Sequence, residues 1–287
     1  MKSLISEFSY GFALTNEIVG WQQLDTAPIF PSLIQEGQAG GGYDLHLDYP
    51  GLPLFLQFKR SDCMTGANAR EYKLIPNLQR PYHRFEITDS STSEQHRMLM
   101  DLEDSTNIVL YAAPRFHTPE EFNQAWQYQT VSSRSIFVSP NTIGNLPNGR
   151  HTVAFDQNRT WVCSEPKEIK TLSAGQLISK ITKTIEKTEM PLRELIPNLL
   201  EDVRSIDDIR QSGEYREYYD PEAQYKIAAP DYEEGASSVD ATISEPFGIS
   251  VRKPKPIEDE TLLQIRELSE LSSAIFGTQM YILQKIG

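Results

Sequence analysis

Three polar residues on two adjacent predicted strands have the types and spacing of a metal-dependent hydrolytic site. Residues 43–49 alternate in polarity and residues 54–59 have strand composition, with a Pro-Gly turn between them, so the sequence predicts a β-hairpin. Because side chains alternate with period two, Asp44, Gln57 and Lys59 would share one face. The register that places them there pairs Asp44 with Lys59, His46 with Gln57, and Asp48 with Phe55.

The chemistry of such a face is metal-assisted hydrolysis. A carboxylate and an amide oxygen are hard ligands that suit Mg²⁺ or Mn²⁺. The metal would polarise a phosphate and lower the pKa of a bound water, while Lys59 would orient that water or stabilise developing charge. The alternative is a solvent-exposed hairpin face with an Asp44–Lys59 pair that contributes little to stability.

Glu17 is a fourth candidate site residue. Residues 3–21 predict a well-buried helix, and on its wheel Glu17 falls in an apolar sector. A carboxylate there is costly unless it is paired or bound to a metal. The alternative is a glutamate at the helix edge that reaches water. The apolar neighbours on the wheel are Tyr10, Ala13, Leu14 and Trp21.

The order of these features resembles the PD-(D/E)XK nuclease superfamily, which has the restriction-endonuclease-like fold. In that family an acid on the first helix precedes an Asp on the second core strand and a (D/E/Q)-x-Lys motif on the third. Glu17, Asp44 and Gln57-Phe58-Lys59 match those positions. The predicted helix at 92–104 and the apolar strand at 108–114 match the next elements, so the resemblance covers about residues 5–116.

The resemblance implies an α/β fold: a restriction-endonuclease-like mixed sheet flanked by helices. It also implies a Mg²⁺- or Mn²⁺-dependent nuclease that hydrolyses phosphodiester bonds, in DNA before RNA, in bacterial restriction, phage defence or DNA repair. Asp44, Gln57 and Glu17 would hold the metal, and Lys59 would position the attacking water. Tyr43 replaces the usual Pro and Gln57 the usual acid, which keeps open an inactive nuclease-fold subunit that serves in binding or assembly.

Other candidates are weaker. Gln95, in Ser93-Glu-Gln-His96, would reach a metal-bound water or a phosphate, or lie on a plain surface helix. Cys163 follows a predicted strand but has no His at a telling offset, so a nucleophilic role is not expected. The local supply of phosphate contacts is Lys59, Arg60, Arg70, Lys73, Arg80, Arg84 and Arg97.

The chain is expected to divide into a nuclease-like domain at 1–210, an acidic proline-containing arm at 211–257 and an amphipathic helix at 258–287. An apolar stripe from Ile265 to Ile282 gives the last helix a face for the main domain, a protein partner or a second copy. Further helices are predicted from Pro119, at 173–187 and at 191–206, and further strands at 135–139 and 160–163.

Composition narrows the function classes. A net charge of −13 argues against non-specific nucleic-acid binding through the overall field, so a local basic groove would be needed. No apolar run is long enough for a membrane helix, no signal peptide is visible, and the two cysteines lack zinc-ligand spacing, so we expect a cytoplasmic location. A third interpretation is an unrelated α/β interaction protein that matches the motif by chance.

Overall fold

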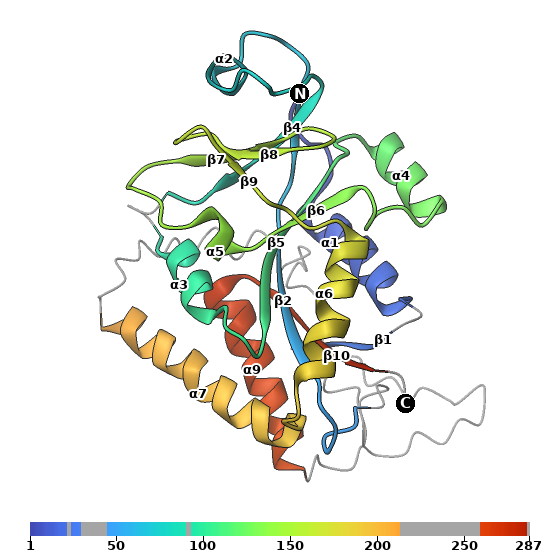
Figure 1. Cartoon of the computed structure of the whole chain (residues 1–287), viewed down its shortest axis with the longest axis vertical. Helices are drawn as coiled ribbons and strands as arrows, with labels where there is room; N and C mark the ends of the chain where they lie inside the picture. The colour runs from blue at the N-terminus through green and yellow to red at the C-terminus, as the bar shows by residue number, and fades with distance from the viewer. Residues whose placement is uncertain (22–23, 30–44, 90–92, 213–258, 286–287) are drawn as a thin grey trace, which may run out of the picture.

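The structure is a computed structural model that describes residues 1–21, 24–29, 45–89, 93–212 and 259–285. Within these ranges the chain forms eight helices and ten strands, arranged in one mixed and one antiparallel sheet of five strands each (Figure 1). The expected mixed α/β class is confirmed. No helix in the described ranges is both long enough and apolar enough to span a bilayer.

The mixed sheet forms the centre of the molecule. Its strands β2 and β5 run parallel, with Leu54 opposite Ile108, and the other neighbouring strands run antiparallel. The strand order is β1 (Leu24–Ile29), β10 (Gln279–Lys285), β2 (Leu52–Phe58), β5 (Ile108–Pro114) and β6 (Ser135–Val138).

Helices cover both faces of this sheet because its strands are apolar on both sides, as buried strands require. Leu54 and Leu56 of β2 join the core beneath α1 (Glu7–Val19) and α6 (Ala174–Lys187). Phe55 points the other way. It joins the core formed with α3 (Gln95–Leu102), α7 (Leu192–Gln211) and α9 (Glu260–Phe276), and Figure 1 shows the two groups of helices on opposite sides.

The antiparallel sheet lies beyond the ends of β2 and β5 (Figure 1). Its strands are β3 (Asp62–Met64), β4 (Tyr82–Ile87), β7 (His151–Phe155), β8 (Thr160–Val162) and β9 (Lys167–Ile169). Three short helices connect the elements: α2 (Arg70–Leu74), α4 (Pro119–Gln127) and α5 (Pro140–Ile143). Phe85 of β4 and Phe155 of β7 pack in the same hydrophobic core as residues of the mixed sheet, so the two sheets share this core.

Local sequence explains several element boundaries. A capping box starts α4, because the Thr118 side chain accepts from the Glu121 N–H and the Glu121 side chain accepts in return from Thr118. At its other end, α9 stops where Gly277 takes a left-handed conformation with φ of 62°. The strand predicted at 108–114 is β5, and the helices predicted at 173–187 and 191–206 correspond to α6 and α7.

The predicted hairpin is wrong. Residues 45–49 form a turn, and the antiparallel neighbour of β2 is β10, which pairs Leu54 with Tyr281. The Pro50-Gly51 turn therefore does not fold residues 46–48 back onto β2. Instead His46 exchanges backbone hydrogen bonds with the Gln284 side chain, because the apolar β10 takes the place next to β2.

The chain end also differs from the expected single helix. The helix ends at Phe276, and the strand β10 follows and lies between β1 and β2 in the mixed sheet. Ile265, Leu268 and Ile275 of the predicted stripe are buried on α9, whereas Ile282 is buried in β10. Residues 260–285 therefore pack in the same fold as the described residues before position 212. The predicted acidic arm lies almost entirely outside the described residues.

Candidate functional site

Gln57 and Lys59 lie at the carboxyl end of β2 on the face that carries α3, α7 and α9. Side chains two positions apart share a face of an extended strand, and the face is that of Phe55 and Tyr111, which line the core under those helices. Gln57 is only 5% exposed, and Lys59 just after the strand is partly exposed. The structure thus brings together two of the four predicted site residues.

The Gln57 side chain is only half satisfied. Its Nε2 donates to the Phe276 carbonyl oxygen at 2.8 Å, and the Nε2 of Gln95 on α3 donates to the same oxygen at 2.9 Å. Gln57 Oε1 is buried and has no hydrogen-bond partner among the described residues. A buried amide oxygen without a donor costs about 1–3 kcal/mol. It is therefore the atom at this site most in need of a ligand.

Lys59 extends over an aromatic ring in the same region. Its Nζ lies 5.5 Å from the centre of the Tyr111 ring, a cation–π arrangement. Burial lowers the pKa of Lys59 because desolvation penalises the ammonium, and the Glu7 carboxylate partly opposes this shift. Beside it, His96 Nε2 lies 2.9 Å from the Gly144 carbonyl oxygen and Nδ1 lies 2.9 Å from the Tyr111 hydroxyl.

Glu17 is not brought to this region. It lies on α1, whose apolar residues pack into the core on the opposite face of the mixed sheet. Its two carboxylate oxygens accept the backbone N–H groups of Val131 and Ser132, each at 2.7 Å. The expectation that a carboxylate in this apolar sector needs partners therefore holds. The partners are two amides of the turn before β6.

The other predicted residues are dispersed or lie outside the described ranges. Asp44 lies outside the described ranges. Arg84 pairs with Glu71, and Arg80 lies 4.7 Å from the centre of the Tyr72 ring, so both are engaged on the β3–α2–β4 side. Burial raises the pKa of Cys163 to about 12, so its thiol is a poor nucleophile.

Two members of the region were not singled out from the sequence. Tyr111 lies in the apolar run of β5. The alternation of side chains along β5 indicates which face Tyr111 occupies, but not that Gln57 and Lys59 lie beside it. The Phe276 carbonyl oxygen is a backbone atom, which no residue pattern identifies, and it comes from a helix end 219 positions away from Gln57. Gln95 was considered from the sequence, and its placement beside Gln57 is the part of that hypothesis that the structure supports.

Comparison of the chain with protein-family models, with curated proteins and with solved structures finds no match. The function must therefore be inferred from the chain's own residues and contacts.

Proposed function

We propose that this chain is a metal-dependent nuclease of the PD-(D/E)XK type that hydrolyses phosphodiester bonds, with DNA rather than RNA as the expected substrate. The observation that carries the proposal is the end of β2. There Gln57 Oε1, which has no hydrogen-bond partner in the described part of the chain, and the Lys59 ammonium lie on one face. After the Gln-x-Lys motif the chain forms β3, α2 and β4 before the helix α3 and the strand β5 that the resemblance implies. The parallel pairing of β2 with β5 supports the proposal.

The donor set fits a hard cation in part. Gln57 Oε1 is a neutral oxygen ligand of the kind that Mg²⁺ and Mn²⁺ accept. The resemblance assigns the carboxylate to Asp44, which lies outside the described residues. His46, two positions later, hydrogen-bonds Gln284 beside the amino end of β2, the opposite end from Gln57, so the described residues supply only the Gln57 oxygen to this site. A bound divalent cation would polarise the scissile phosphate and lower the pKa of a water.

The protein's own groups would then act on substrate and water. Lys59 would orient the attacking water and stabilise the negative charge that builds on the phosphate. The hydrogen bond from Gln57 Nε2 to the Phe276 carbonyl oxygen would hold the Gln57 side chain in the orientation that leaves Oε1 free, and Gln95 donates to the same oxygen. Glu17 has no role in this version, because its two oxygens already accept backbone amides.

The placement of Glu17 also favours a second candidate, a nuclease-fold subunit that binds nucleic acid without cutting it. With Gln57 in place of an acid and Glu17 engaged elsewhere, Asp44 would be the one carboxylate left for the metal. Such a site would bind a divalent cation weakly and would serve recognition or assembly.

The test is a cleavage assay with Mg²⁺ and with Mn²⁺ on supercoiled, linear and single-stranded DNA and on RNA. It compares the wild type with Lys59→Ala and with Lys180→Ala, a matched exposed lysine on α6 at the opposite face of the sheet. Cleavage that is lost in the first variant and kept in the second, with unchanged circular dichroism, is the expected result. Equal cleavage by all three proteins would contradict the nuclease assignment.

If none of the proteins cleaves, binding decides between the two candidates. Mn²⁺ and DNA binding that is lost in Asp44→Ala would support the non-cutting subunit. A wild type that binds neither Mn²⁺ nor nucleic acid would overturn both candidates.

A further inference from the structure

Three buried side chains with metal-binding atoms meet at the junction of the two sheets. Cys63 lies on β3, His83 lies directly opposite it on β4, and His117 lies just after β5. The thiol sulfur and one ring nitrogen of each histidine all lie within 4.8 Å of one another. The three residues are 4%, 8% and 5% exposed, so the cluster is shielded from water.

The imidazoles of this cluster lack the hydrogen bonds that buried histidines normally make. His83 Nε2 and both ring nitrogens of His117 have no hydrogen-bond partner among the described residues. Glu121 Oε2 lies 2.9 Å from His117 Nδ1, close enough for an ion pair but without hydrogen-bonding geometry. Buried polar atoms of this kind destabilise the fold unless something binds them. By contrast, both ring nitrogens of His96 have partners.

We propose that Cys63, His83 and His117 together bind one transition-metal ion of the zinc class. A thiolate with two imidazoles is a donor set for Zn²⁺ and similar borderline-soft ions, whereas Mg²⁺ prefers oxygen. The site is distinct from the one proposed at Gln57 in both residues and ligand chemistry. Three protein ligands fill three corners of a tetrahedron and leave the fourth to a water or another small ligand.

The protonation state of His83 fits this assignment, whereas the Cys63 thiol must lose its proton when the metal binds. Burial, followed by the charge of the neighbouring His117, lowers the pKa of His83 to about 4, so its ring is neutral and its lone pair is available. Burial raises the pKa of the Cys63 thiol. Metal binding therefore breaks the S–H bond, forms the metal–sulfur bond and releases one proton to solvent.

Charged groups on the surrounding elements act in both directions. Arg115 and Arg134 lower the pKa of His83, and as cations they oppose a second cation nearby. The Glu121 carboxylate and the Cys63 thiolate offset this charge. Since the Arg134 guanidinium also lies 5.4 Å from the centre of the Phe116 ring and Arg115 donates to the Ser135 carbonyl oxygen, both cations have other partners.

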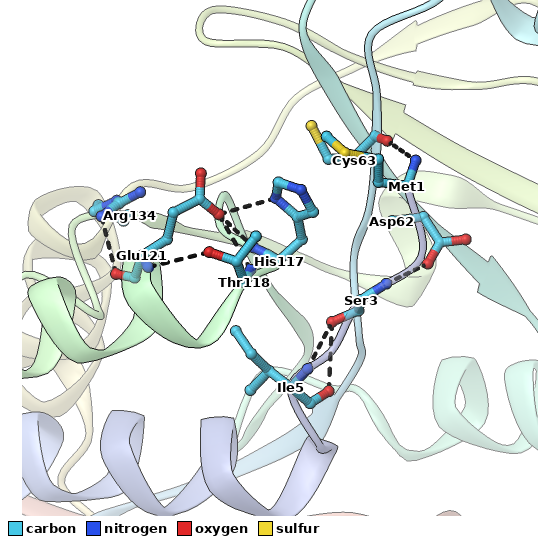
Figure 2. Close-up of polar contacts among 9 residues, drawn as sticks. All are labelled: Met1, Ser3, Ile5, Asp62, Cys63, His117, Thr118, Glu121 and Arg134. Carbon is cyan, nitrogen blue, oxygen red and sulfur yellow. Dashed lines mark hydrogen bonds and ion pairs between the residues drawn. The ribbon is translucent and has the colours of Figure 1, made fainter.

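Glu121 orients the His117 ring. Its Oε2 accepts the backbone N–H groups of His117 at 2.8 Å and Thr118 at 3.2 Å, so the first turn of α4 holds the carboxylate against Nδ1. Figure 2 shows the Glu121 carboxylate facing the His117 ring, with Cys63 on the strand beyond it. Because the Glu121 carboxylate lies beside Nδ1, we expect the other ring nitrogen, Nε2, to bind the metal. Glu121 is therefore a positioning residue.

The ion would stabilise the fold as well as leave one position open to a small ligand. Cys63 and His83 belong to the antiparallel sheet, and His117 belongs to the segment that leaves the mixed sheet, so one ion would connect the two sheets. A ligand that binds only the folded state stabilises it, and its removal should lower the melting temperature. No motif spacing indicates this site, because 19 residues separate Cys63 from His83 and 33 separate His83 from His117.

The test is the metal content of the purified full chain and its uptake of Zn²⁺ and Co²⁺ after chelation. We expect about one zinc per chain and, with Co²⁺, a thiolate-to-metal charge-transfer absorption band. Cys63→Ser should abolish the band. Cys163→Ser, which changes the other buried free cysteine, should keep it, as should Asp44→Ala, which separates this site from the proposed nuclease site.

Two further measurements keep the proposal decidable if Cys63→Ser folds poorly. Glu121→Gln should weaken Zn²⁺ binding several-fold while the charge-transfer band persists, since the ligands remain. A chelator should lower the melting temperature of the wild type and of Cys163→Ser by the same amount. A wild type that takes up neither Zn²⁺ nor Co²⁺, or equal uptake by Cys63→Ser, would overturn the proposal.

Discussion

The Gln57 amide donates to the carbonyl oxygen of Phe276, so the end of the central strand β2 is tied to the last residue of α9. Gln95 donates to the same oxygen, and Gly277 follows in a left-handed conformation. The conformation at the α9–β10 junction thus decides how two side chains of the candidate site are held.

Replacing the Gln57 amide by a carboxylate should destabilise the protein. In Gln57→Glu the N–H donor is lost and a charged oxygen faces the Phe276 carbonyl oxygen, so unfolding free energy should fall by about 1–3 kcal/mol. Urea unfolding at neutral pH measures the change. Gln124→Glu, an exposed position on α4, is the control and should leave the midpoint nearly unchanged. If a divalent cation binds Oε1, added Mg²⁺ should restore part of the lost stability in Gln57→Glu.

Gly277→Ala should lower the free energy of unfolding by about 1–2 kcal/mol, because the left-handed conformation at φ of 62° is unfavourable for alanine. Its Cβ would also lie 3.2 Å from Gln95 Nε2, which forces that amide to shift slightly, and 3.5 Å from Gln57 Nε2, an ordinary contact. Thermal unfolding gives the change in stability. Gly175→Ala in α6, where nothing lies within 4 Å of the new Cβ, should be neutral or stabilising. Similar losses in both variants would contradict this account.

Glu17→Gln tests whether Glu17 supports the fold or a metal. The variant keeps one acceptor oxygen but turns an amide group toward the second backbone N–H, so it should lose about 1–3 kcal/mol of stability. Mn²⁺ affinity should not change. Glu201→Gln, an exposed carboxylate on α7, is the matched control for charge. A drop in Mn²⁺ affinity with unchanged stability would return Glu17 to the metal site.

The parts of the fold that were predictable are those with local signals. The uninterrupted apolar run of β5 and the Pro at the start of α4 placed those elements correctly. The pairing of β2 was not predictable in the same way, because strand partners are chosen by tertiary packing. The Pro50-Gly51 turn suggested that residues 43–49 would pair with β2. Instead β10, more than 200 positions later in the sequence, pairs with β2.

Of the candidate site, only the relative placement of side chains on a single strand could be predicted from the sequence. Gln57 and Lys59 share a face because alternation is a property of the strand itself. The stripe from Ile265 to Ile282 failed as one helix because a 3-and-4 spacing continues through Gly277, which ends α9, into a strand that is buried on both faces. The identity of Glu17's partners depended on a turn more than a hundred residues away.

Acidification should weaken the fold through His96. The Gly144 carbonyl oxygen can only accept, so His96 Nε2 carries the proton and Nδ1 accepts from the Tyr111 hydroxyl, which satisfies the neutral ring. Burial, with smaller contributions from the charges of His151 and Lys59, lowers the pKa of His96 below its ordinary value of 6.5, and the bond to Gly144 partly opposes this. Below pH 6.5 the unfolded chain therefore binds a proton that the folded protein does not.

Stability should fall as pH drops below this value, by at most about 1.4 kcal/mol per pH unit from this group, until the folded protein takes up the proton too. Urea midpoints between about pH 7.5 and pH 5 measure the slope. His96→Gln should flatten it relative to wild type, because the titrating ring is gone. His46→Gln, at an exposed histidine, should leave the slope unchanged. A slope that is the same in wild type and His96→Gln would mean that other buried groups, and not His96, carry the acid sensitivity.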